Sequence, residues 1–268
     1  MCTAVYLRRG RALLGRTLDL EYDIDCRVLT VEGGARLDIP WLYRPCGYSF
    51  TGMGQNRAGV PLMFDGVNEH GLAAAALRFS GDAVYSSESD FQRGIPSYAL
   101  IPFILSCCSS VAEAYTELSG AQITDRPFDG ETPASPLHFI FADRSGTLIA
   151  EPTKDGLKLY RNRSFVLANS PSLERHLGFI FDGIPSGYTS PERFRRASEL
   201  LLQREEASSR ESDCGASHAE WDMLSVLGSV AVPYGVSERE GGYSRTRYIS
   251  VMDLTAPSYK LCELTARS

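Results

Sequence analysis

Apolar residues occur in short runs separated by turn sequences along much of this chain, which is typical of β-strands. The runs Thr3–Leu7 and Ala12–Arg16 flank a basic turn and predict a β-hairpin. Gly66–Phe79 predicts a turn that leads into a strand of small residues. Four more strands are predicted between positions 137 and 168, and the last two at Thr246–Leu254 and Tyr259–Leu264.

Helical periodicity is strongest over Pro96–Leu118, where Ser109 and Ser110 are expected to break the segment into two helices by capping. Ser190 followed by proline predicts the start of another helix, which runs to about Glu206. A polar loop is expected at positions 208–217, before a third helix near positions 218–227.

This order of elements predicts an α+β protein with mainly antiparallel sheets, whose outer faces are covered by helices. A chain of 268 residues with 43% hydrophobic and 22% charged residues is typical of a soluble globular protein. We expect one domain over residues 2–268.

The formal charge of −6 argues against nucleic acid as a partner, because phosphate binding requires clustered cations. No apolar stretch is long enough to cross a bilayer, and the amino terminus lacks a secretory pattern. We therefore expect a cytoplasmic protein with no membrane partner.

The common catalytic and metal-binding motifs are absent from the sequence. The seven cysteines are scattered without a CxxC pair, which predicts neither a zinc site nor a disulfide framework. The four histidines have no metal-ligand spacing, and His138, within an apolar strand, is interpreted as structural. No cofactor or metal is expected.

Cys2 differs from the other cysteines by its position. Methionine is normally removed when a small residue follows, and removal of Met1 would leave Cys2 with a free α-amine. The ordinary pKa of such an amine is about 7.7–8.0, so one residue would hold both a thiol nucleophile and its proton acceptor. The alternative is that Cys2 is merely adjacent to the initiator methionine.

The predicted hairpin places Arg16 and Asp19 near Cys2. Arg16 would favour the thiolate, and Asp19 would hold the α-amine, both through charge pairing. An ordinary surface ion pair at a strand end is the alternative. Together these residues favour nucleophilic catalysis by an amino-terminal thiol.

The chain resembles the choloylglycine hydrolases, which include conjugated bile acid hydrolases and penicillin V acylases of the N-terminal nucleophile superfamily. The resemblance extends over nearly the whole chain and is carried by MCTA (1–4), GRTLDLE (15–21), DGVNEHGLAAAALRF (65–79), LHFIFADRSG (137–146), LANSP (167–171), SPERFRR (190–196) and VPYGVSEREGGYSRTRYISVMDL (232–254).

The resemblance implies a four-layer αββα sandwich of two antiparallel sheets, with Cys2 as the nucleophile. It implies that Arg16 and Asp19 are the family's paired active-site residues. Asn169 would donate its side-chain NH₂ to the oxyanion hole, and Arg193 matches a later arginine near the nucleophile.

Arg78 departs from the resemblance, because bile acid hydrolases have asparagine there and penicillin V acylases commonly have tyrosine. The family uses the backbone N–H at this position as the second oxyanion donor, which arginine can supply. The guanidinium could pair with the sulfonate of taurine or the carboxylate of glycine. Alternatively, a register shift of one residue would turn it outward.

The resemblance implies hydrolysis of the amide that joins a bile acid to glycine or taurine, in an apolar cleft bordered by loops at Trp41–Phe50 and Met53–Phe64. Alternatives within the family are penicillin V and N-acyl homoserine lactone acylases, and a non-catalytic binding homologue is the alternative outside it. A homo-oligomer is implied. In the family, the segment between Asn169 and Arg193 carries an extension that helps build a tetramer. This segment is short here, so the resemblance does not predict that the chain forms the usual tetramer.

Overall fold

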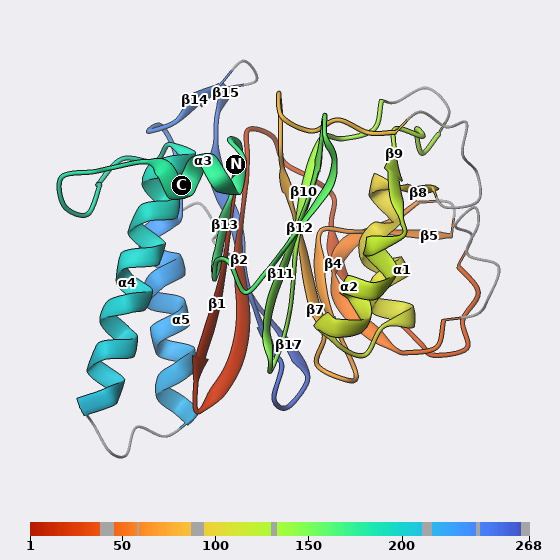
Figure 1. The fold of residues 1–268 in the computed structure, drawn as a ribbon, viewed down its shortest axis with the longest axis horizontal. Helices are drawn as coiled ribbons and strands as arrows, with labels where there is room; N and C mark the ends of the chain where they lie inside the picture. The colour runs from red at the N-terminus through yellow and green to blue at the C-terminus, as the bar shows by residue number, and fades with distance from the viewer. Residues whose placement is uncertain are drawn as a thin grey trace.

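The computed structural model describes residues 1–37, 46–57, 59–86, 94–129, 133–210, 216–239 and 242–263. Two antiparallel sheets form its centre (Figure 1). The first has five strands in the order β13-β1-β2-β16-β17, and these strands are β13 (Val166–Ala168), β1 (Cys2–Arg9), β2 (Arg11–Leu20), β16 (Arg245–Asp253) and β17 (Ser258–Glu263).

The second sheet has eight strands in the order β12-β11-β10-β7-β6-β4-β3, with β5 paired to β4. Its strands are β3 (Arg27–Val31), β4 (Phe50–Arg57), β5 (Val60–Met63), β6 (Asp65–Asn68), β7 (Ala73–Arg78), β10 (Leu137–Asp143), β11 (Gly146–Thr153) and β12 (Gly156–Arg161). A short parallel pair, β8 (Gly94–Pro96) and β9 (Gln122–Thr124), and a second pair, β14 (Glu238–Arg239) and β15 (Gly242–Tyr243), lie outside both sheets.

Helices cover the outer face of each sheet, as Figure 1 shows. Helices α4 (Ser190–Arg210) and α5 (Ala216–Val230) pack on β1 and β2, and the short α3 (Leu173–Gly178) precedes them. On the other side, a 3₁₀ turn at Ser97–Ala99 leads into α1 (Leu100–Cys107) and α2 (Val111–Ser119), which pack on the eight-stranded sheet. The layer order is αββα, and the predicted fold is confirmed.

Two hydrophobic clusters explain why the layers hold together. One fills the space between the sheets and continues under α4 and α5, while the other lies between the eight-stranded sheet and α1 and α2. Strand β7 contributes to both, with Ala73, Ala75 and Leu77 in the first cluster and Ala74 and Ala76 in the second. Small side chains suit a strand that is buried on both faces.

The amino-terminal hairpin forms as predicted, with Gly10 at its turn at a φ of 65°. Gly15 allows α5 to approach β2, since a Cβ there would lie 2.6 Å from Leu227 Cδ1. The break between α1 and α2 is also confirmed, because the Ser110 hydroxyl caps α2 by accepting from the backbone N–H of Glu113 at 3.3 Å.

Two expectations were wrong. The stretch Met53–Phe64, expected as a loop, belongs largely to strands β4 and β5, whose glycines permit close contact between strands: a Cβ on Gly54 would lie 2.5 Å from the carbonyl oxygen of Leu62. The loop expected at 208–217 is partly helical, because α4 continues to Arg210 and α5 begins at Ala216. Positions 41–45 and 211–215 lie outside the described residues.

Candidate active site

Cys2 lies at the start of β1, a strand that is paired on both sides. Its Cα partner on β2 is Leu18, and the next residue, Thr3, pairs with Ala168 on β13. The residue is only 4% exposed, and its Sγ lies 3.0 Å from Nη2 of Arg16. The positive charge of the Arg16 guanidinium therefore lies directly against the sulfur.

Arg16 is fully buried on β2 and is held from the second sheet. Its Nη1 donates to the carbonyl oxygen of Phe64 at 3.0 Å and lies 3.4 Å from Oδ2 of Asp65. Burial alone would lower the pKa of Arg16, but the neighbouring Tyr248, Cys2 and Asp65 raise it above its ordinary value. The guanidinium therefore stays charged beside the thiol.

Asp65 is the centre of a buried polar network behind Cys2, and sequence reasoning did not single it out. Its Oδ2 accepts from Tyr248 at 2.8 Å and from Ser250 at 3.3 Å, and its Oδ1 accepts from Tyr259 at 2.6 Å. Burial, with the charge of Asp65 as the next cause, raises the pKa of both tyrosines. Both hydroxyls therefore remain donors.

Asn169 directly follows β13 and reaches Cys2 with its side chain. Its Oδ1 accepts from the backbone nitrogen of Cys2 at 2.5 Å and from Nη2 of Arg193 at 2.9 Å. Because a guanidinium can only donate, these contacts fix which side of the amide carries the NH₂ group. One of its two N–H bonds donates to the carbonyl oxygen of Arg78 at 2.9 Å.

Arg193 lies in the first turn of α4 and is fully buried against β1. Its Nη1 donates to the carbonyl oxygen of Cys2 at 2.6 Å and to the hydroxyl of Thr3, and it lies 3.8 Å from Oδ2 of Asp19. Arg193 thus connects Cys2, Asn169 and Asp19, as a residue near the nucleophile should.

The Asp19 carboxylate is expected to hold the α-amine that Cys2 gains once Met1 is removed, and the structure shows the contacts of this carboxylate with Met1 still attached. The carboxylate accepts from Thr246 at 2.5 Å and from Thr17 at 3.3 Å. The backbone of Asp19 contacts Met1 instead: its nitrogen donates to the carbonyl oxygen of Met1 at 2.8 Å, and its carbonyl oxygen accepts from the Met1 amine.

Arg78 ends β7, and the strand geometry settles which way its groups point. Phe79 donates its backbone N–H to Pro136 on the β10 side, so the N–H of Arg78 points to the opposite edge of β7, where its carbonyl oxygen meets Asn169. Its side chain shares a face with Ala76, and both residues line the cavity beside Cys2. The outward orientation considered as an alternative is therefore not the one observed.

The cavity beside Cys2 has a volume of about 370 Å³. Its floor is formed by Met1, Cys2 and Asp19 from the five-stranded sheet, and its walls are mostly apolar. The apolar side chains are Leu18, Leu20, Tyr22, Ile24, Leu62, Met63, Phe64, Ala76, Tyr98, Phe128 and Leu137. A volume in this range is typical of small-molecule sites.

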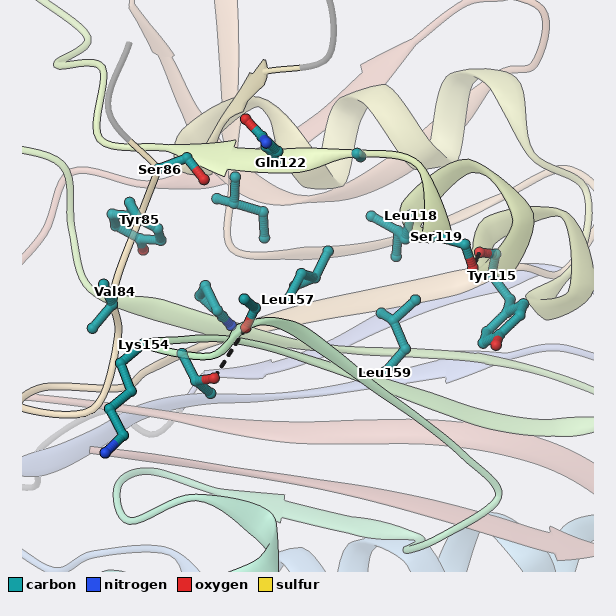
Figure 2. A pocket seen from close by; sticks show the side chains of 15 residues that line it. Val84, Tyr85, Ser86, Tyr115, Leu118, Ser119, Gln122, Lys154, Leu157 and Leu159 are labelled. Carbon is teal, nitrogen blue, oxygen red and sulfur yellow. Dashed lines mark hydrogen bonds between the residues drawn. The ribbon is translucent and has the colours of Figure 1, made fainter. Parts of the chain in front are cut away.

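A second cavity, of about 700 Å³, lies between β12 and the segment of α2 and β9 (Figure 2). In Figure 2, Leu159 from β12 lies opposite Leu118 of α2, and Leu157 lies on the same side of the cavity as Leu159. It shares no lining residue with the cavity beside Cys2, and its lining contains no cysteine, histidine or carboxylate. It offers no group for amide chemistry.

Other candidate chemistry is sparse in the described part of the chain. No group of three or more His, Cys, Asp or Glu side chains there could hold a metal ion. His138 is fully buried, with its ring 4.4 Å from Phe79 and its Nδ1 3.2 Å from Glu151 Oε1. No helix among the described residues has the length and apolar character needed to span a membrane.

The structure therefore brings together all six residues that the sequence singled out: Cys2, Arg16, Asp19, Arg78, Asn169 and Arg193. Sequence reasoning missed Asp65, Thr246, Tyr248 and Tyr259. The available signal was an acidic residue, Asp65, directly after the apolar run 60–64 and before a strand of small residues, a place where a carboxylate must be buried and bonded.

Comparison with known proteins agrees with this geometry. Residues 2–182 match the sequence model described as linear amide C–N hydrolases, choloylglycine hydrolase family. A bile salt hydrolase/transferase of Lactiplantibacillus plantarum is 27% identical over 97% of this chain and 88% of its own length. The chain thus belongs to the choloylglycine hydrolase family of linear amide C–N hydrolases.

Two solved structures share the fold. A variant of the conjugated bile acid hydrolase from Clostridium perfringens superimposes with a TM-score of 0.89 and 24% identity, covering 100% of this chain and 91% of its own. Penicillin V acylase from Agrobacterium tumefaciens gives a TM-score of 0.77 at 21% identity, covering 98% and 83%. At these identities the likeness shows the N-terminal nucleophile hydrolase fold alone.

Proposed function

We propose that this protein hydrolyses the amide bond of glycine- or taurine-conjugated bile acids, with the thiol of Cys2 as nucleophile. The observation that carries the proposal is the thiol itself, 3.0 Å from a fully buried guanidinium and at the floor of a mostly apolar cavity. The bile salt hydrolase of L. plantarum, which matches nearly the whole chain, supports the choice of substrate.

The reaction requires that Cys2 be the first residue of the mature protein. Removal of Met1 converts the Cys2 nitrogen from a peptide N–H into an α-amine, which remains within hydrogen-bond distance of Asn169 Oδ1, 2.5 Å away. The neutral amine accepts the thiol proton while Sγ attacks the substrate carbonyl carbon. The proton then passes to the amide nitrogen, the amine product leaves, and an acyl thioester remains on Cys2.

Water then hydrolyses the thioester, and the α-amine again transfers the proton. The α-amine accepts a proton from water as the oxygen attacks the thioester, and the thiol is released with the free acid. Arg16 stabilises the thiolate both as nucleophile and as leaving group. No metal or organic cofactor enters any step.

The oxyanion of each tetrahedral intermediate needs donors that are already in place. The second N–H of the Asn169 amide and the backbone N–H of Arg78 are proposed as these donors, since the first N–H of Asn169 ties the two residues together. Donors of this type contribute about 2.7–4 kcal/mol each in other hydrolases. Arg193 and Asp19 act as positioning residues: Arg193 holds the Asn169 amide, and the Asp19 carboxylate lies 3.8 Å from Arg193.

The apolar cavity is proposed to hold the hydrocarbon part of the acyl group. Leu20, Ile24, Leu62 and Phe64 present a continuous apolar surface, which suits a rigid sterol better than a polar acyl group. A non-catalytic binding role would give no reason to keep a buried thiol beside a buried guanidinium.

A substrate panel tests the proposal. Purified protein is assayed for amine release from glycocholate, taurocholate, penicillin V and an N-acyl homoserine lactone, with the Cys2→Ala variant as the blank. Hydrolysis of either bile salt, lost in the variant, is the expected result. Cleavage of penicillin V or of the lactone, with neither bile salt cleaved, would refute the bile acid assignment and support the corresponding acylase activity instead.

The maturation step is tested by intact-mass measurement, which should show the chain beginning at Cys2. Retention of Met1 in fully active protein would refute the proton route through the α-amine. Residues 2–268 are proposed to act as one unit that assembles into a homo-oligomer, and light scattering after size exclusion measures its mass.

A further inference from the structure

Two arginines at the cavity differ from those behind Cys2, because Arg57 and Arg78 are exposed and take no part in an ion pair within the described residues. The two acids at the cavity do not balance them. Asp19 lies 3.8 Å from Arg193, and Asp129 has an interaction of its own. Although the protein has a formal charge of −6, no described carboxylate neutralises these two cations at the cavity.

Arg57 and Arg78 are not equivalent. The guanidinium of Arg57 lies 5.7 Å from the centre of the Phe128 ring, so it already has a cation–π partner. Arg78 has no such contact among the described residues, and no hydrogen bond from its guanidinium is found there. Arg78 is the cation that remains available to a ligand.

The backbone of Arg78 lies close to the nucleophile, and its side chain lines the same cavity. Its carbonyl oxygen is fixed by Asn169, whose Oδ1 binds the nitrogen of Cys2, so one side chain separates Arg78 from the nucleophile. The acyl group is directed toward the apolar walls. The charged end of Arg78 cannot be covered by hydrocarbon without losing its hydration, which leaves the amine half of the substrate as its partner.

We infer that Arg78 is a specificity-determining residue that selects amides whose amine half carries an anion, a carboxylate or sulfonate, one or two carbons from the amide nitrogen. This inference rests on the proposed function and deepens it. A guanidinium matches both anions because two parallel N–H groups can bond two oxygens. It gives no advantage to a neutral amine half such as an ethanolamine or a lactone.

The test compares matched pairs of amides that differ only in this charge. Glycine and glycinamide conjugates, and taurine and taurinamide (2-aminoethanesulfonamide) conjugates, are made on both a cholyl and a phenoxyacetyl group. kcat and KM are measured for wild-type protein, Arg78→Gln, Arg78→Lys and the control Arg57→Gln. The backbone donor of residue 78 is present in every variant.

Wild-type protein should favour the anionic member of each pair by about tenfold in kcat/KM, a value at the low end for an ion-paired hydrogen bond because the site is exposed. Arg78→Gln should remove this preference, mainly through a higher KM for the anionic amides, with neutral amides changed less than about twofold. Arg78→Lys should retain part of it, and Arg57→Gln should leave it unchanged.

The outcomes separate this inference from the proposed function. Hydrolysis of phenoxyacetyl amides alone, with the charge preference lost in Arg78→Gln, overturns the bile acid assignment but supports Arg78. Equal rates on charged and neutral amides in wild-type protein would refute the selective role of Arg78 and leave the proposed function intact. Equal losses on both kinds of amide in Arg78→Gln would do the same. Inactivity on every conjugate overturns both.

Discussion

The two sides of Cys2 handle charge in opposite ways. Behind it, Arg16, Asp65 and Arg193 are fully buried, and each contacts a partner of opposite charge. In front of it, Arg57 and Arg78 reach solvent at the cavity without any carboxylate partner in the described residues. Buried, satisfied networks rigidify a site, whereas exposed cations adapt to a ligand. Under the proposed function, the rear side would set the chemistry and Arg78 on the front side would set the choice of substrate.

The largest effect is expected from a substitution of Cys2, which lies between the two sides. Cys2→Ser keeps the size of the side chain but supplies a weaker nucleophile that Arg16 cannot ionise. Turnover should fall at least about 10³-fold, while the melting temperature and circular dichroism stay close to wild type. Hydrolysis near the wild-type rate would show that Cys2 is not the nucleophile.

Asp65→Asn breaks the rear network at its centre. The variant leaves the buried charge of Arg16 without its carboxylate, which should lower the free energy of unfolding by about 3–5 kcal/mol. Urea denaturation measures the loss, and Tyr259→Phe, which removes one hydroxyl bonded to Asp65, is the control at about 1 kcal/mol. The double variant Arg16→Met with Asp65→Asn should recover part of the loss, and full additivity would contradict the pairing.

Asn169→Asp separates the two functions of the Asn169 side chain. Aspartate retains the acceptor for Arg193 but has no N–H for the oxyanion, so kcat should fall about 10²–10³-fold in this variant and in Asn169→Ala alike. A change confined to KM in both would make Asn169 a ground-state binding residue instead.

His176 supports Asn169 from the rear side through Ser190, whose hydroxyl lies 3.1 Å from Nε2 of His176 and donates to the Asn169 carbonyl oxygen at 2.9 Å. Burial lowers the pKa of His176 from 6.5 to about 4. Below pH 6.5 the unfolded chain therefore binds a proton that the folded chain does not, and stability is lost as pH falls toward 4. The loss attributable to His176 should approach about 3 kcal/mol by pH 4.

Denaturation of wild type and His176→Gln at pH 7, 5.5 and 4 measures this contribution. The variant should lose less stability over that range than the wild type does. If the free energy of unfolding of the two proteins depended on pH in the same way, His176 would bind its proton as readily in the folded chain as in the unfolded chain.

The smallest effect is expected on the front side. Arg57→Gln and Arg78→Gln remove exposed cations without ion pairs, so each should change the free energy of unfolding by less than about 0.5 kcal/mol. Arg16→Gln, the same chemical change on the rear side, should cost several times more. Similar melting temperatures for all three variants would erase the distinction between the two sides.

Local patterns predicted the elements whose partners are close in the sequence. The hairpin at Cys2–Leu20 and the break between α1 and α2 follow from alternation, a turn glycine and a serine cap. Strands β4 and β5 were missed because the glycines of β4, Gly52 and Gly54, resemble loop residues. The reason for these glycines, close contact with the backbone of Asp65 and Leu62, exists only in the folded sheet.

Cys2, Arg16 and Asp19 were singled out from their position on the hairpin, whereas Arg78, Asn169 and Arg193 came only through the resemblance. The surroundings of these candidate site residues were not predicted. Asp65 receives its hydrogen bonds from Tyr248 and Tyr259, which lie more than 180 positions away in the chain. No periodicity in either segment reports that pairing, since it depends on how the two sheets face one another. The orientation of Arg78 likewise needed the register of β7 against β10.

The placement of Met1 has a practical consequence. Met1 lines the same cavity as Cys2 and is fixed by two backbone bonds to Asp19, so a residue that precedes Cys2 occupies part of the space proposed for substrate. An amino-terminal affinity tag would therefore both block the α-amine and plug the cavity, and would yield folded protein without activity. Recombinant material for every assay above should carry its tag at the other end of the chain.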